Sequence, residues 1–134
     1  MSAVEEPAAP PLAQHAEPRR LPLWAYPLLA LLCLGLFAPG FFDIPPFDRD
    51  EARFAQASHQ MLTTGDLIDI RFQDEARHKK PVGIYWLQAA AAAMALDDPA
   101  AKEIWAFRIP SLIGATLAVL ATAWGGARLF GPAV

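Results

Sequence analysis

The sequence contains a single cysteine, Cys33, and only three histidines. One cysteine cannot build a disulfide framework, and no Cys/His spacing typical of a zinc site is present. An excess of positive charge is also missing, because 11 Lys and Arg residues stand against 14 Asp and Glu residues, for a net charge of −3. A dedicated nucleic-acid binder is therefore excluded, since such proteins carry a massed basic surface.

Charged residues are scarce over long stretches, which indicates a membrane protein. Hydrophobic residues make up 54% of the 134 residues and the mean hydropathy is +0.25, which is high for a soluble domain of this size. Residues 21–42 carry no charge, and residues 109–130 carry only Arg128. At about 1.5 Å per residue, either segment can cross a hydrocarbon core of roughly 30 Å.

A shorter apolar segment, residues 81–96, lies between these two. It needs borrowed length or shielding by other helices to cross a bilayer, and we predict it as the second of three spans. Residues 1–20 are rich in Ala, Pro and Glu and predict a disordered cytoplasmic tail without the basic start of a signal peptide. The predicted fold class is therefore an all-α membrane protein with three transmembrane helices.

Residues 43–80, between the first two predicted spans, hold eight of the 14 acidic and six of the 11 basic residues. Charges beside a membrane are costly unless they are paired or used. Asp48, with Glu51 three positions later, predicts a capping box at the start of a short amphipathic helix that ends at Gly65. We expect this helix to lie in the membrane interface through its apolar face, which consists of Phe54, Ala57, Met61 and Leu62.

Several motifs of this loop occur in an order and spacing that resemble one group of enzymes. They are DEARFA at 50–55, Gly65-Asp66, KKP at 79–81 followed by Tyr85-Trp86, and the Arg108-x-Pro-Ser start of the last span. This pattern resembles the N-terminal signature of the family 39 and family 83 glycosyltransferases. That group has the GT-C fold and includes the aminoarabinose transferases that modify lipid A and the protein O-mannosyltransferases. Because its members have eleven or more spans and a soluble domain, the resemblance implies that residues 21–134 are the N-terminal part of a GT-C transmembrane domain, completed by a C-terminal part.

The resemblance implies an enzyme that uses a polyprenyl-phosphate-linked sugar and transfers it, with inversion, to a lipid, glycan or protein acceptor. It also implies a multi-pass protein of the bacterial inner membrane, with a cytoplasmic N-terminus and an extracytoplasmic loop at 43–80. Counting Lys and Arg alone would place that loop in the cytoplasm. We give the resemblance more weight, because basic residues that bind an anionic ligand need not follow the count. No certain cofactor is implied, and the use of a divalent metal is left open.

Three residues match the functional groups of the family. Asp50 matches its catalytic carboxylate, which can orient an acceptor hydroxyl and remove its proton. Arg53 follows one helical turn later, and Lys80 precedes the proline of the second predicted span. Both match groups that bind the phosphate of the donor. Possible supporting residues are Glu51, Lys79 and Tyr85.

Each of these residues also has a plainer interpretation. The acidic residues can cap a helix, the basic residues 77–79 can contact anionic lipid headgroups, and Tyr85 and Trp86 can belong to an interfacial aromatic belt. The alternative function is accordingly a noncatalytic three-helix membrane protein that binds lipid phosphate or a partner through the same loop. A transporter fragment is a further alternative, because intramembrane glycine and proline also occur there.

Overall fold

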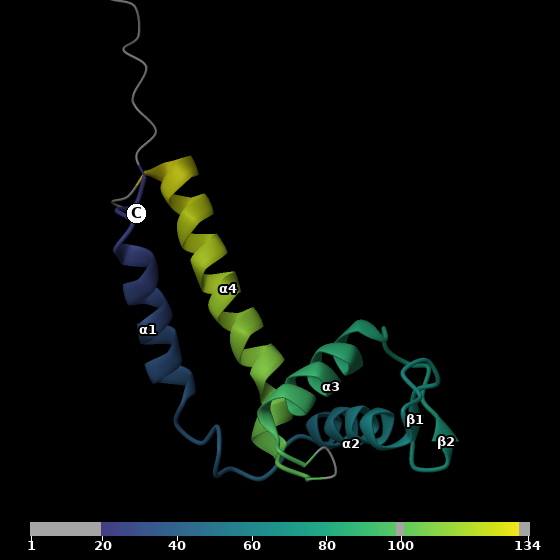
Figure 1. Cartoon of the computed structure of the whole chain (residues 1–134). Coiled ribbons are helices and arrows are strands. Elements are labelled where there is room, and N and C mark those ends of the chain that lie inside the picture. The colour runs from purple at the N-terminus through teal and green to yellow at the C-terminus, as the bar shows by residue number, and fades with distance from the viewer. Residues whose placement is uncertain (1–19, 99–100, 132–134) are drawn as a thin grey trace, which may run out of the picture.

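The structure is a computed structural model that describes residues 20–98 and 101–131, so nearly all of the predicted tail lies outside the described residues. These residues form four helices and one two-stranded hairpin: α1 Ala25–Phe37, α2 Arg49–Thr64, β1 Arg71–Phe72, β2 Glu75–Ala76, α3 Gly83–Ala95 and α4 Ile104–Phe130. α1 and α4 lie side by side and run in opposite directions, while α2 and α3 lie across one end of this pair (Figure 1). The mostly helical architecture that the sequence predicts is confirmed.

α4 is long and apolar enough to cross a membrane, and among the described residues it is the one helix with both properties. It has 27 residues and begins at Ile104, ahead of the predicted span 109–130, so Pro110 lies inside the helix. Large apolar side chains are exposed along it, as expected of a surface that faces lipid or other helices. They include Ile113, Leu117, Trp124, Leu129 and Phe130.

α1 covers the centre of the first predicted span as 13 helical residues. The chain then continues in turns, with the Ala38 N–H bonded to the Leu34 carbonyl at 2.9 Å and the Phe41 N–H to the Ala38 carbonyl at 3.0 Å. The helix itself is therefore about 20 Å long, shorter than a bilayer core. Its leucines are mostly exposed, including Leu28, Leu31, Leu32 and Leu36.

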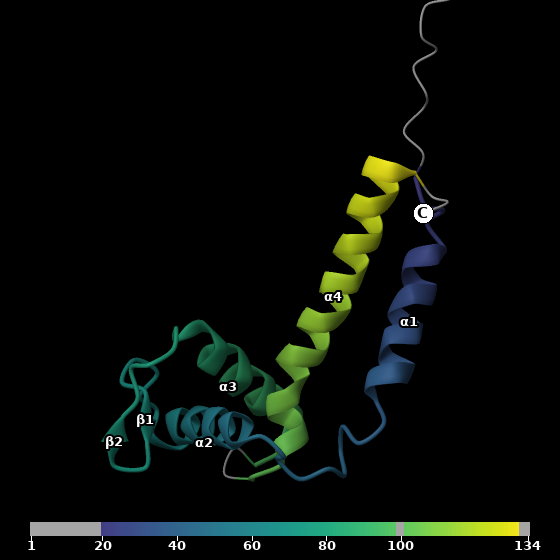
Figure 2. The same ribbon diagram turned by 180° about the vertical axis from the view of Figure 1, so that it is seen from behind.

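The second predicted span, residues 81–96, is not confirmed. It forms α3, whose 13 residues measure about 20 Å, which is shorter than a core of roughly 30 Å. α3 also departs in direction from α1 and α4, as the reverse view shows (Figure 2). Its small side chains let it pack closely against both α2 and α4, and the buried ones include Ala89, Ala91 and Ala92.

α2 begins and ends where the sequence predicts. The Asp48 carboxylate accepts a hydrogen bond from the Asp50 N–H at 3.0 Å and so caps the first turn. Gly65 adopts the left-handed conformation, φ 74°, and its N–H bonds the Met61 carbonyl at 2.9 Å. Glu51 does not complete the expected capping box, because its carboxylate binds Arg108 of α4 instead.

The apolar face of α2 is covered by protein, which corrects the expectation that this face rests in the membrane interface. Ala57 and Met61 are 0% and 1% exposed, and they pack with Ile70 and Tyr85. The physical reason is that α3 folds back over α2, so the residues that α2 offers are used in helix packing. Tyr85 accordingly belongs to the core and not to an aromatic belt.

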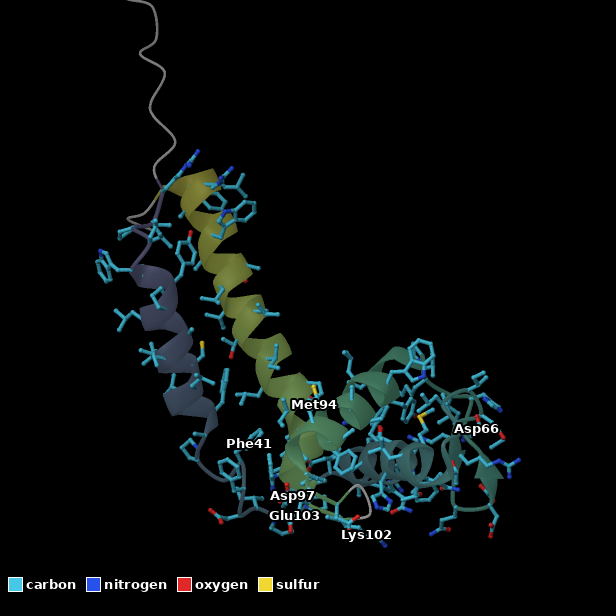
Figure 3. All side chains as sticks on the ribbon, viewed as in Figure 1. Phe41, Asp66, Met94, Asp97, Lys102 and Glu103 are labelled. Atoms are coloured by element: carbon cyan, nitrogen blue, oxygen red, sulfur yellow. The ribbon has the colours of Figure 1, made fainter. Side chains whose placement is uncertain are left out.

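Hydrogen bonds order the segment between α2 and α3. The Gln60 amide group donates to the Gln73 carbonyl at 2.9 Å and accepts from the Gln73 N–H at 3.0 Å. The Asp66 carboxylate accepts from the N–H groups of Asp69 and Ile68, both at 3.0 Å, and these bonds lower the pKa of Asp66. Asp66 therefore shapes the turn after α2, and it lies at the end of the α2–α3 unit farthest from α1 (Figure 3).

Polar bonds join this unit to the α1–α4 pair. The Ser58 hydroxyl donates to the Gln88 side chain at 2.9 Å, and Gln88 donates to the Phe107 carbonyl at 3.1 Å. Arg108 donates to Glu51 at 2.5 Å and to the Phe41 carbonyl at 2.8 Å. One arginine of α4 thus holds both the start of α2 and the turn that follows α1.

Candidate functional site

Asp50 lies in the first turn of α2 with its side chain open to solvent. The side chain is 54% exposed, and its Oδ1 atom lies 4.0 Å from Nη1 of Arg53 and 4.0 Å from Nη2 of Arg77. Both distances are too long for hydrogen bonds, so these pairs are loose electrostatic contacts. A carboxylate with two cations beside it and free lone pairs can accept a proton from an incoming group.

The structure brings Arg53 to Asp50, as the spacing of one helical turn predicts. The Arg53 side chain is 38% exposed. Within the described residues, its one ionic contact is with Asp50 of the same helix. Arg53 can therefore reorient toward a ligand at little cost.

Arg77 is the second cation of the site, and its environment differs from that of Arg53. Its side chain is only 12% exposed. Its Nε donates to the Tyr85 hydroxyl at 3.1 Å, and its guanidinium lies over the Phe54 ring, 5.6 Å from the centroid. Arg77 is therefore held by protein side chains and is not a freely solvated basic residue.

Tyr85 reaches the site only through Arg77. Its side chain is 0% exposed and its ring packs against Phe54 at 5.1 Å between centroids. The ring cannot stack on a sugar in this position, because protein covers it. Its supporting part in the site is to hold the guanidinium of Arg77.

Glu51 points away from Asp50, although the two are neighbours in sequence. Its carboxylate pairs with Arg108, and the two side chains are 30% and 16% exposed. Because Arg108 also binds the carbonyls of Gly40 and Phe41, this pair fixes the position of the first turn of α2, on which Asp50 sits. Glu51 thus positions the site.

Lys79 and Lys80 lie in the exposed bend that precedes α3. Neither has a hydrogen bond or an ion pair with another residue in the described part of the chain. The structure therefore does not join Lys80 to Asp50 or Arg53 by contact. Both ammonium groups are free to move on long stems and can attract an anion at some distance.

Arg77 is the residue that sequence reasoning missed. Its sequence neighbours, His78, Lys79 and Lys80, are all exposed, so the basic run looks uniform in the sequence. What distinguishes Arg77 is its contact with Tyr85 and Phe54, on two different helices. No spacing rule in a single sequence encodes such a contact.

The chemistry available here is that of a proton acceptor beside fixed positive charge. Within residues 20–98 and 101–131, no group of three or more His, Cys, Asp or Glu side chains is arranged to hold a metal ion. The two guanidinium groups can bind an anion such as a phosphate, with planar donor geometry. The site thus places a carboxylate that can accept a proton beside groups that can bind an anion.

Comparisons with known proteins find relatives that share one name, undecaprenyl phosphate-alpha-4-amino-4-deoxy-L-arabinose arabinosyl transferase. The protein numbered 2 from Pseudomonas fluorescens is 36% identical over 103 residues, which cover 72% of this chain and 16% of the relative. The protein numbered 1 from the same organism is 34% identical over 102 residues, which cover 72% of this chain and 17% of the relative. A protein from Pseudomonas paraeruginosa is 32% identical over 93 residues, which cover 65% of this chain and 16% of the relative.

The predicted resemblance to aminoarabinose transferases is thereby confirmed. The chain spans only 16 to 17% of the length of these relatives. No protein-family model matches the chain, and no solved structure matches it.

Proposed function

We propose that this chain forms part of a membrane glycosyltransferase that takes a sugar from a polyprenyl-phosphate donor. The observation that carries the proposal is the open Asp50 carboxylate between Arg53 and Arg77, in a segment similar to undecaprenyl-phosphate-dependent arabinosyl transferases. Because the relatives are much longer, we propose that the chain acts together with a further segment of the kind they possess. That segment would supply the rest of the donor and acceptor sites.

In the proposed reaction, Asp50 removes the proton of an acceptor hydroxyl on a lipid, glycan or protein. The acceptor oxygen then bonds to the anomeric carbon while the bond from that carbon to the phosphate oxygen breaks on the opposite face, which inverts the configuration. The proton moves to Asp50, and the negative charge stays on the departing polyprenyl phosphate. Arg53 and Lys80 stabilise that charge, Arg53 from the site itself and Lys80 from the neighbouring bend.

The arrangement of the helices supports a topology with two crossings, by the α1 segment and by α4. The α2–α3 unit lies at one end of the α1–α4 pair, and Phe41, Asp97, Lys102 and Glu103 gather at the same end (Figure 3). We propose that this end is extracytoplasmic in a bacterial inner membrane and that the N-terminus is cytoplasmic. The residues on both sides of α3 would then share one compartment.

Cysteine labelling on intact cells tests this topology. After Cys33→Ser, single Gln73→Cys and Lys102→Cys variants should both react with an impermeant thiol reagent, because both positions lie at the same end of the α1–α4 pair. Arg20→Cys is the matched control and should react only after lysis. Labelling at 73 with protection at 102 would favour the three-span arrangement, and labelling at 20 alone would reverse the orientation.

The function is tested by exchanging the matched segment of the Pseudomonas fluorescens transferase for this chain. The chimera should restore the arabinosylated product, detected by mass spectrometry, in a Pseudomonas strain that lacks its own transferase. A well-expressed chimera without product, whose parent transferase is active in the same cells, would argue against the proposal. Retained binding of polyprenyl phosphate in that case would favour the noncatalytic lipid-phosphate binder.

A further inference from the structure

We propose that Arg77 is a phosphate-binding residue of this site, held by Tyr85 and Phe54 so that its free guanidinium nitrogens face the space beside Asp50. The inference rests on the proposed function and deepens it, because it names the group that binds the phosphate of the polyprenyl donor in a fixed orientation. Three properties of Arg77 carry it: its support, its free donors and the charge balance around it.

The support comes from three separate elements. The Arg77 N–H bonds the Ile70 carbonyl at 2.7 Å, Nε bonds the Tyr85 hydroxyl of α3 at 3.1 Å, and the guanidinium rests over the Phe54 ring of α2 at 5.6 Å. Tyr85 is itself fully buried and packs with Ala57, Met61 and Ile70. An arginine held in this way loses little conformational entropy when it binds a ligand.

The free donors are the two Nη groups of the guanidinium. Arginine has five N–H donors, and within the described residues only Nε of Arg77 has a hydrogen-bond acceptor. Nη2 lies 4.0 Å from Asp50, beyond hydrogen-bond reach. No fully buried side-chain nitrogen in the described part of the chain lacks a partner, so these Nη groups are at least partly exposed. Their fork matches two oxygens of one phosphate.

The charge balance favours an anion. Arg53 and Arg77 face one carboxylate, Asp50, so the three groups leave one positive charge in excess. A purely structural arginine that is 12% exposed would be expected to have a close carboxylate partner, as Arg108 has in Glu51 at 2.5 Å. Arg77 has only the loose contact with Asp50. A phosphate can therefore complete its coordination without displacing a strong bond.

The test measures binding of undecaprenyl phosphate to this chain in phosphatidylcholine nanodiscs by native mass spectrometry. Arg77→Gln should weaken binding roughly ten- to a hundredfold, as expected for loss of a charge-assisted pair of hydrogen bonds. Arg77→Lys keeps the charge but loses the fork and should give an intermediate loss. Arg71→Gln is the matched control, since Arg71 is 52% exposed and pairs with Asp69, and it should bind like the parent.

Two further measurements separate a phosphate contact from a structural role. Undecaprenol, which lacks the phosphate, should bind the parent and Arg77→Gln equally. Tyr85→Phe should weaken phosphate binding severalfold, but it should add nothing in the Arg77→Gln background, because the tyrosine acts through the arginine. Circular dichroism and thermal unfolding identify the folded variants. If Arg77→Gln does not fold, Arg77→Lys replaces it as the test variant.

The outcomes divide clearly. Equal binding of undecaprenyl phosphate by the parent and the folded Arg77 variants would overturn this inference alone. If the parent binds phosphatidylglycerol as tightly as undecaprenyl phosphate, the site recognises lipid headgroups in general, and the inference is also overturned. If inorganic phosphate competes at a similar concentration, the site recognises free phosphate, and the inference that it binds the polyprenyl donor is overturned. A parent that binds no undecaprenyl phosphate would overturn this inference, whereas the proposed function is tested separately by the product of the chimera.

Discussion

Asp50→Asn is expected to lower sugar transfer by about 10² to 10⁴ in the chimera that carries this chain, the usual contribution of a general base. Asparagine keeps the shape of the side chain, but it removes the negative charge beside Arg53 and Arg77 and cannot accept the proton. Folding should change little, because the Asp50 side chain is 54% exposed and makes no close hydrogen bond. The rate is measured with purified chimera and a lipid-linked sugar.

Asp48→Asn is the matched control for this prediction. Asp48 lies two residues earlier, and its carboxylate caps α2 through the Asp50 N–H at 3.0 Å. Asparagine caps a helix about as well as aspartate, so transfer should stay close to that of the parent. If the Asp50 and Asp48 variants were equally active, the acidic motif would be reduced to a helix cap.

Met61→Ala is expected to destabilise the α2–α3 unit by about 2–5 kcal/mol, the range for truncating a buried methionine. Met61 is 1% exposed and packs with Ala57, Ile70 and Tyr85. Truncation leaves a cavity between α2 and α3 that these neighbours can fill only in part. The free energy is obtained from denaturant titration of the chain in detergent, followed by far-UV circular dichroism.

Met94→Ala is the control for the same side-chain change. Met94 is 83% exposed on α3, so its truncation removes few contacts within the chain and should alter stability by about 0.5 kcal/mol or less. A loss at Met94 as large as that at Met61 would contradict the packing described here. If Met61→Ala did not lower the free energy of unfolding, and a tryptophan at this position showed lipid-dependent fluorescence, the data would support a position of α2 in the membrane interface.

The parts of the fold that follow from local chemistry could be predicted from the sequence. Asp48 and Gly65 delimit α2 because a carboxylate satisfies its first free N–H groups and a glycine adopts the left-handed turn at its end. The apolar segment that forms α4 could also be predicted, because its length and lack of charge are properties of that segment alone. The pairing of Asp50 with Arg53 follows from helical spacing.

The parts that depend on which elements meet could not be predicted. The apolar face of α2 looks the same in the sequence whether lipid or α3 covers it, and so does the alanine-rich face of α3. Glu51 and Arg108 are 57 residues apart, and the place of Glu51 in the motif suggested a cap. Arg77 looked like its exposed basic neighbours, because Tyr85 and Phe54 approach it only in the folded chain.

The central claim is that this segment carries the catalytic carboxylate of a polyprenyl-phosphate sugar transferase. Its most direct test is a single-turnover reaction of the purified chimera with undecaprenyl-phosphate-linked aminoarabinose and an acceptor extract from the Pseudomonas host. We expect the acceptor to gain the sugar and undecaprenyl phosphate to appear in equal amount. In the Asp50→Asn variant, the rate of sugar transfer and the rate of undecaprenyl phosphate release should fall by the same factor. Transfer that proceeds at the parental rate without the Asp50 carboxylate would contradict this account.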